Sequence, residues 1–163
     1  MSEAKESDGS GGNGSELVSD VDENLAGATP QAAGTAQPDM SGMLGQAAWV
    51  MMNSVNHKHL FLADMEWLLM PPIALKQFRL WRREKIPVAY ASWAYLDDAV
   101  VERIRQGGPL RLAPKEWRSG KNAWLVDFVC PFGGAAEAMR QLREETFKGH
   151  TLHTLTPQDM QPS

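Results

Sequence analysis

Hydrophobic positions recur at two different spacings along the chain, and the spacing changes near residue 77. Before that point apolar residues fall three and four positions apart, which is the period of a helix with one buried face. Over 77–83 apolar and polar residues alternate instead, as they do in a half-buried strand. The same analysis along the chain predicts helices at 43–52, 60–70, 99–106 and 135–147. It predicts strands at 77–83, 87–96, 123–130 and 149–155.

Capping and turn residues set the boundaries of the predicted helices. Ser41 can N-cap the first helix, because its hydroxyl can accept a free backbone N–H there. Pro71 should end the second helix, since the residue before a proline avoids the α region. Asp97 or Asp98 can cap the third helix, and Gly107 should stop it.

The elements follow the order helix, helix, strand, strand, helix, strand, helix, strand. This order predicts an α/β (α+β) fold with a central, mostly antiparallel sheet flanked by helices. The third strand, at 123–130, looks the most buried, because Asp127 is its only polar residue.

Charge and composition divide the chain at residue 42. Residues 1–42 hold eight acids, one base and no aromatic residue, for a formal charge of −7, whereas residues 43–163 carry +3 and all six tryptophans. A Gly-, Ser- and Ala-rich acidic segment cannot bury enough apolar surface to offset the entropy of ordering it. We expect a disordered acidic tail at 1–42, one domain at 43–156 and a polar tail at 157–163.

Several classes of protein are excluded by composition. A charge of +3 over the domain is a weak footprint for nucleic-acid binding. Cys130 is the only cysteine, so no internal disulfide forms. The N-terminus lacks the basic and apolar regions of a signal peptide, and no apolar run is long enough for a membrane span. We therefore expect a cytoplasmic protein that binds no nucleic acid.

Two polar residues with unusual neighbours are the candidate catalytic residues. His57 lies at the break between two predicted helices, and its ordinary pKa near 6.5 suits proton transfer at neutral pH. Asp127 lies among apolar residues, where a carboxylate is costly unless it is paired. Asp127 could orient a histidine. The plain alternatives are an exposed, helix-capping His57 and an Asp127 on the open side of the sheet.

The other candidate nucleophiles and metal ligands have less support from the sequence. Ser54 would complete a hydrolase triad, but the G-x-S-x-G elbow of such enzymes is absent. The remaining histidines, His59, His150 and His153, do not have the spacing of a zinc site, so no metal or bound cofactor is expected. Cys130 is interpreted as a buried, small apolar residue.

A basic stretch lies at 76–85. Five bases stand there against one acid: Lys76, Arg79, Arg82, Arg83 and Lys85. Such a stretch is ordinarily a solvated strand face and turn. Its functional interpretation is a docking patch for an acidic partner.

Several motifs occur in one order over about 43–134. They include Ser54-x-x-His57, Pro87-Val-Ala-Tyr-Ala-Ser-Trp-Ala94, Trp117-Arg-Ser-Gly120 and Asp127-Phe-Val-Cys-Pro-Phe-Gly133. With these motifs the chain resembles the RTX toxin-activating lysine acyltransferases, the hemolysin-activation family. The resemblance implies a GNAT-like acyltransferase fold, although the glycine-rich pyrophosphate loop of that superfamily is missing.

The resemblance also implies an activity and roles for two residues. The family transfers a fatty acyl group from acyl–acyl carrier protein to internal lysines of an RTX pro-toxin in the cytoplasm, and so activates the toxin. It implies that His57 is the base on the lysine amine, or briefly carries the acyl group itself. Asp127 would fix the tautomer of His57 and stabilise its positive charge.

The partners implied by the resemblance are an acyl carrier protein and an RTX pro-toxin. Acyl–acyl carrier protein would be a co-substrate, and its acidic surface would dock on Arg79, Arg82, Arg83 and Lys85. For the oligomeric state, a homodimer is kept as an alternative to a monomer. The alternative function is a binding module that holds acyl carrier protein or an RTX protein without turnover.

Overall fold

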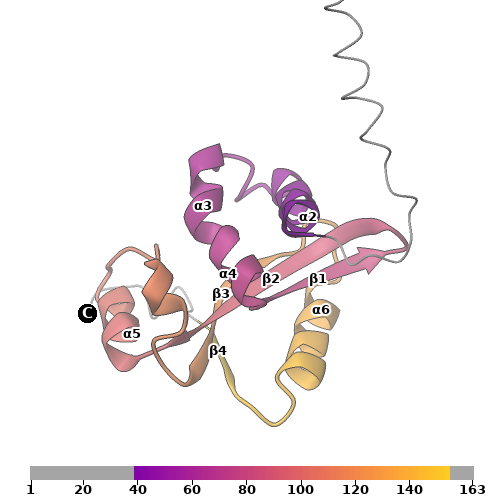
Figure 1. Cartoon of the computed structure of the whole chain (residues 1–163). Coiled ribbons are helices and arrows are strands. Elements are labelled where there is room, and N and C mark those ends of the chain that lie inside the picture. Colours follow the sequence, from indigo (N-terminus) through magenta and orange to yellow (C-terminus); the bar gives the residue numbers. More distant parts are fainter. Residues whose placement is uncertain (1–38, 155–163) are drawn as a thin grey trace, which may run out of the picture. The chain divides into compact units, whose positions relative to one another are not determined.

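The computed structural model describes residues 39–154 (Figure 1). The α-helices are α2 (Met40–Met52), α3 (Met65–Leu68), α4 (Met70–Leu75), α5 (Asp98–Arg105) and α6 (Ala135–Gln141). Two short 3₁₀ helices, η1 (Leu62–Asp64) and η2 (Pro114–Trp117), and one π-helical turn, η3 (Leu142–Thr146), complete the helical elements. The strands are β1 (Phe78–Arg83), β2 (Ile86–Leu96), β3 (Asn122–Val129) and β4 (Leu152–Thr154). The predicted tail at 157–163 and residues 1–38 lie outside the described residues.

The four strands form one sheet in the order β1-β2-β3-β4. β1 pairs with β2, and β2 with β3, in antiparallel fashion, whereas β3 and β4 are parallel. The α/β class and the mostly antiparallel sheet predicted from the sequence are therefore confirmed, and the arrangement is consistent with a GNAT-like fold. None of the described helices is long and apolar enough to cross a membrane.

Helices cover both faces of the sheet. Side chains alternate along β2, so Tyr90 packs with α2, α3 and α4 while its neighbour Ala91 packs with α6 and η3 on the opposite face. Farther along β2, Ala94 and Leu96 pack against α5 and η2. Figure 1 shows α2 and α6 on either side of the strands.

The most buried strand is β2, and the expectation that 123–130 would be so is wrong. Six consecutive residues of β2, numbers 89–94, are buried, whereas residues 125–128 of β3 are only partly buried. The cause is the short last strand, because β4 pairs with β3 only at Ala123, Trp124 and Leu125. The second half of β3 has a strand neighbour on one side only within the described region.

Two predicted helix boundaries are wrong for local reasons. Asp39 rather than Ser41 caps α2, and its Oδ1 accepts the Gly42 N–H at 2.8 Å. The predicted helix at 60–70 is divided among η1, α3 and the start of α4. Pro71 and Pro72 open α4 instead of ending a helix, because the first turn of a helix needs no proline N–H.

The third helix, predicted at 99–106, lies at Asp98–Arg105 and has the predicted cap and stop residues. Asp97 caps α5 by accepting the Val100 N–H at 2.9 Å, and Gly107 follows with φ +84°. Beyond η2 the chain passes very close to the end of β2. Gly120 donates its N–H to the Tyr95 carbonyl at 2.8 Å, and a Cβ at Gly120 would lie 2.0 Å from the Leu96 oxygen. Only glycine fits there.

Candidate active site

His57 lies on a tight turn directly after α2. The backbone N–H groups of His57 and Lys58 both donate to the carbonyl of Ser54, at 3.2 and 3.0 Å. This turn brings two side chains of the same segment together. The Ser54 hydroxyl lies 2.9 Å from Nδ1 of His57, so the Ser54-x-x-His57 spacing has a direct structural meaning.

Asp127 reaches His57 because β3 contains a bulge. Ser92 is opposite Asp127, but the next residue, Trp93, is opposite Leu125, so Val126 is an extra residue in β3. Leu125 packs on the α6 side of the sheet, and strict alternation from it would place Asp127 on that side too. The bulge turns Asp127 to the face that carries α2. Its Oδ1 lies 3.0 Å from Nε2 of His57.

The three side chains form a line in the order Ser54, His57, Asp127, and the line defines the tautomer of the imidazole. A carboxylate can only accept, so Nε2 of His57 carries the proton that Asp127 accepts. In neutral His57, Nδ1 then holds the free lone pair and accepts the Ser54 O–H. Nδ1 is therefore the nitrogen available for taking a proton.

Asp127 also controls the charge of His57. The hydrogen bond from His57 to Asp127, together with the negative charge of Asp127, raises the pKa of His57 above its ordinary value of 6.5, while partial burial works against the rise. The side chains of His57 and Asp127 are 19% and 12% exposed, so the pair is sheltered yet reachable. Such a histidine can take up a proton and have the resulting imidazolium stabilised.

Comparison with known proteins identifies the family. The family model described as RTX toxin acyltransferase family matches residues 36–162. The chain belongs to this family. The resemblance inferred from the motifs is thus confirmed, and it favours an acyltransferase over a binding module.

Several relatives of the family carry informative names. A leukotoxin-activating lysine-acyltransferase from a Pasteurella haemolytica-like species is 31% identical over 69% of this chain and 68% of its own. A protein-lysine myristoyltransferase from Kingella kingae is 32% identical over 65% of this chain and 63% of its own. A protein-lysine palmitoyltransferase from Bordetella bronchiseptica is 34% identical over 66% and 56%. The matched segments thus span between just over half and about two thirds of these RTX toxin acyltransferase relatives.

The four basic residues predicted to bind an acyl carrier lie in different surroundings in this family member. Arg79 is engaged, with its guanidinium 2.6 Å from Glu145 and 3.0 Å from the Thr146 hydroxyl. Arg82 is exposed and donates to Gln46 at 2.6 Å. Arg83 and Lys85 are exposed at the β1–β2 hairpin. The positive charges of this surface that are not neutralised by a carboxylate therefore belong to Arg82, Arg83 and Lys85.

The remaining candidates lie apart from the His57–Asp127 pair. His59 and His150 are exposed, and His153 stacks on Trp124 with ring centroids 4.7 Å apart. Cys130 is half-buried, its thiol donates to the Gly133 carbonyl at 3.2 Å, and burial raises its pKa. Among residues 39–154, no three His, Cys, Asp or Glu side chains gather as a metal site would require.

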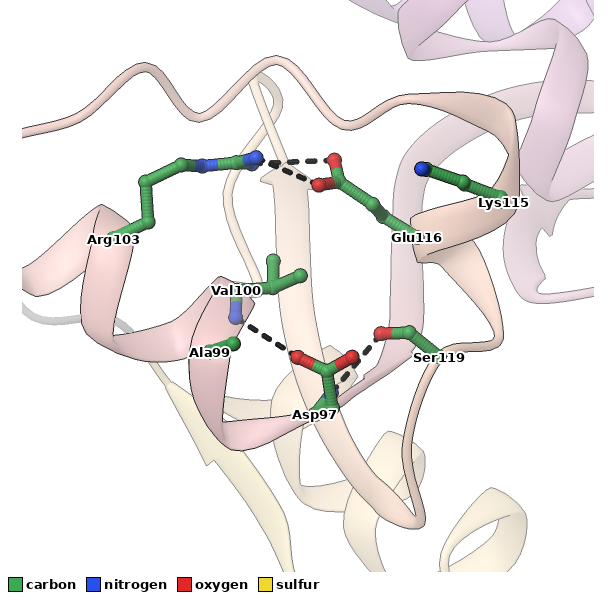
Figure 2. A pocket seen from close by; sticks show the side chains of 7 residues that line it. All are labelled: Asp97, Ala99, Val100, Arg103, Lys115, Glu116 and Ser119. Carbon is green, nitrogen blue, oxygen red and sulfur yellow. Dashed lines mark hydrogen bonds and ion pairs between the residues drawn. The ribbon is translucent and has the colours of Figure 1, made fainter.

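A cavity of about 380 Å³ lies between α5 and η2 (Figure 2). Its polar groups serve the fold. Arg103 holds Glu116 through two hydrogen bonds of 2.6 and 3.2 Å, and so ties α5 to η2. Asp97 caps α5, while its own N–H donates to the Ser119 hydroxyl at 3.0 Å. With Arg103 and both carboxylates engaged in this way, Lys115 is the charged side chain of this lining to which the described residues offer no hydrogen-bond partner, and a single cation does not define a ligand.

Sequence reasoning missed two polar residues beside Asp127. Tyr90 and Ser92 lie on β2 and are fully buried, and in the sequence they stand only as two positions of a longer motif. Two hydroxyls spaced two positions apart in the otherwise apolar stretch 89–94 were the available signal, because such residues share one face of a sheet.

Proposed function

We propose that the chain is a protein-lysine acyltransferase that transfers a fatty acyl group from acyl–acyl carrier protein to internal lysines of an RTX pro-toxin in the cytoplasm. The observation that carries this proposal is the hydrogen-bonded line Ser54–His57–Asp127 within a chain of the RTX toxin acyltransferase family. The names of the relatives, which specify lysine acylation and leukotoxin activation, support the acceptor.

The geometry suits a base at the amine nitrogen. A neutral lysine amine attacks the thioester carbonyl, a C–N bond forms and the C–S bond breaks. Nδ1 of His57 takes the proton that the amine loses, and returns it to the departing thiolate sulfur as a thiol. Asp127, 3.0 Å from Nε2, stabilises the imidazolium between these two transfers.

The same nitrogen would act in the covalent alternative. Nδ1 would attack the thioester carbonyl and the C–S bond would break, which gives an acyl-imidazolium beside Asp127 and a thiolate. The lysine amine would then displace the imidazole, and the proton that the amine loses would convert the thiolate into a thiol. In both routes Nδ1 must carry no proton at the start. The Ser54 hydroxyl, which lies at Nδ1, must move away from it or, in the base route, pass the proton of the amine to it. The two routes therefore share their dependence on His57 and Asp127.

Exposed apolar side chains next to His57 support a fatty acyl donor. Large apolar residues are exposed at the end of α2 and along the following segment: Trp49, Met52, Val55, Phe61 and Leu62, the last to 87%. A contiguous apolar patch marks a binding surface, whereas singly exposed apolar side chains are ordinary. We propose that these five side chains form such a patch. An acyl chain whose thioester lies at His57 would run over them.

Charge supports an acidic carrier at the β1–β2 hairpin. Arg82, Arg83 and Lys85 are exposed there, and Arg83 and Lys85 flank the turn at Glu84. Surface charges of one sign accelerate the encounter with a partner of the opposite sign, and salt weakens the effect. Acyl carrier protein is the partner we propose for this surface.

Transfer can be tested directly. The protein, palmitoyl– or myristoyl–acyl carrier protein and a pro-toxin fragment are combined, and the acceptor lysines are analysed by mass spectrometry. An acyl mass on lysine supports the proposal. Binding of both partners without any acyl transfer would establish the binding module instead.

Carrier docking needs a separate measurement. Arg83→Glu together with Lys85→Glu should raise KM for acyl–acyl carrier protein at low salt with little change in kcat. Lys121→Glu together with Lys148→Glu is the matched control, since it changes the charge by the same amount at two exposed lysines outside the hairpin. Equal KM values for the hairpin variant and the wild type would exclude the hairpin as the docking surface.

A further inference from the structure

Three buried oxygen atoms lie behind the His57–Asp127 pair. They are the Tyr90 hydroxyl, the Ser92 hydroxyl and Oδ2 of Asp127, and within the described part of the chain none of them makes a hydrogen bond of good geometry. Both Tyr90 and Ser92 are 0% exposed. Leaving such groups unpaired in a core is costly, so their presence here calls for a function.

Strand register places the three groups on one face. Tyr90 and Ser92 are two positions apart on β2 and therefore point the same way. Ser92 is directly opposite Asp127 on β3, and directly opposite residues in an antiparallel pair project their side chains to the same face. The bulge at Val126 keeps Asp127 on that face together with Val129, which is opposite Tyr90.

The chemistry of the three groups decides which of them donates and which accepts a hydrogen bond. Burial raises the pKa of Tyr90, and the charge of Asp127 raises it further, while the Ser92 hydroxyl acts in the opposite sense. Tyr90 thus keeps its proton and is a donor. Ser92 can donate and accept, whereas the carboxylate of Asp127 can only accept. Protons can therefore point in series from Tyr90 through Ser92 to Asp127.

We propose that Tyr90 and Ser92 are positioning residues: their hydroxyls turn toward one another and toward Oδ2 of Asp127, and the hydrogen-bonded relay that results satisfies all three groups and holds Oδ1 on His57. This inference rests on the proposed function for its catalytic consequence. Asp127 would be held at both oxygens: Oδ2 by the relay and Oδ1 by Nε2 of His57, at 3.0 Å. A carboxylate held at both oxygens has one orientation, and it orients the imidazole in turn.

The groups around His57 make the relay measurable. Among residues 39–154, Asp127 of β3 is the charged side chain in contact with His57, and Lys58 and His59 on the same turn are exposed. Loss of the relay weakens the hydrogen bond that raises the pKa of His57. NMR titration of the His57 ring therefore reports on the relay without any activity assay.

The test uses Ser92→Ala and Tyr90→Phe in the full chain, with Ser92→Thr as the conservative variant that keeps a hydroxyl. We expect kcat to fall roughly tenfold in each of the first two, with KM for acyl–acyl carrier protein unchanged. The pKa of His57 should move down toward 6.5. Ser92→Thr should restore both quantities, and the Ser92→Ala/Tyr90→Phe double variant should lose no more than the worse single variant.

The matched controls are Tyr95→Phe on the same strand and Ser119→Ala beside α5, both with wild-type kcat expected. A wild-type titration of His57 in folded Tyr90→Phe and Ser92→Ala would overturn the relay, even if both unfold more easily. Should the wild type transfer no acyl group at all, the proposed function fails, but the titration still decides the relay. Should Ser92→Ala not fold, Tyr90→Phe alone decides it.

Discussion

Oδ1 of Asp127 lies 3.0 Å from Nε2 of His57, although 70 positions separate the two residues in the chain. His57 comes from the turn after α2, and Asp127 comes from the bulged part of β3. Because the second ring nitrogen meets Ser54 at 2.9 Å, the imidazole is held from both ends. The site therefore depends on a tertiary contact that neither segment contains alone.

Removal of the imidazole should abolish most of the transfer. We expect His57→Ala to lower kcat by about 10²–10⁴-fold, the range that general acid–base groups contribute. His59→Ala, two positions away and exposed, is the matched control and should keep the wild-type rate. The readout is acyl–lysine formation by mass spectrometry under single-turnover conditions. Equal loss in both variants would mean that the turn, and not the imidazole, is required.

The pH dependence follows from the raised pKa of His57. The base form is the neutral ring, so kcat/KM should rise with pH through an apparent pKa above 6.5. In Asp127→Asn the hydrogen bond and the charge that raise this pKa are lost, while burial, which lowers it, stays. The acid limb should move to lower pH.

The same variant should also lose rate on its plateau. The side-chain amide that Asp127→Asn introduces can donate to Nε2, which moves the ring proton to Nδ1 and blocks the proposed base nitrogen. We expect a plateau reduced on the order of 10²–10⁴-fold. An acid limb that stays at the wild-type position in Asp127→Asn would contradict the assigned coupling between the two residues.

Ser54 separates a direct base from a serine relay. If Ser54 only holds Nδ1, Ser54→Ala should lower kcat roughly tenfold, the effect of losing one hydrogen bond of this kind. Intact-mass analysis of the enzyme mixed with acyl–acyl carrier protein, without acceptor, should then show no acyl group on Ser54. An acyl adduct that disappears in Ser54→Ala would make Ser54 the nucleophile instead.

Much of the fold follows from local sequence signals, and the exceptions have physical causes. The strand alternation of 77–83 and the cap at Asp97 depend on neighbouring residues, and both agree with the structure. Pro71 misled the prediction, because a proline that would stop one helix is equally suited to open another.

The site was harder to predict than the fold. His57 and Asp127 stood out by their neighbours, but which face Asp127 occupies depends on the bulge at Val126, and strict alternation from Leu125 gives the wrong face. The register that puts Ser92 opposite Asp127 is likewise a property of the assembled sheet. Such long-range relationships leave no local pattern in one sequence.

The corrected cap of α2 can be checked by stability. Asp39→Ala removes the side chain that accepts the Gly42 N–H, and should lower the free energy of unfolding by about 1 kcal/mol. Ser41→Ala changes a residue inside the helix, where alanine has the higher helix propensity, and should leave stability equal or slightly higher. Urea denaturation followed by circular dichroism measures both. A larger loss for Ser41→Ala would restore Ser41 as the cap.

Gly120 should be the least replaceable glycine of the described domain. A Cβ at this position would lie 2.0 Å from the Leu96 oxygen and 2.2 Å from the Leu96 carbon, both backbone atoms that cannot turn aside. Gly120→Ala should therefore break the approach of this turn to β2 and the hydrogen bond to Tyr95, at a cost of at least about 2–3 kcal/mol.

The matched substitution for Gly120→Ala is Gly45→Ala in α2. A Cβ there meets open space, so helix propensity alone acts and the variant should gain about 0.5–1 kcal/mol. Urea denaturation of the two variants should thus give changes of opposite sign. Wild-type stability in Gly120→Ala would show that the turn can move away from β2, and that Trp117-Arg-Ser-Gly120 is not held by the close backbone contact.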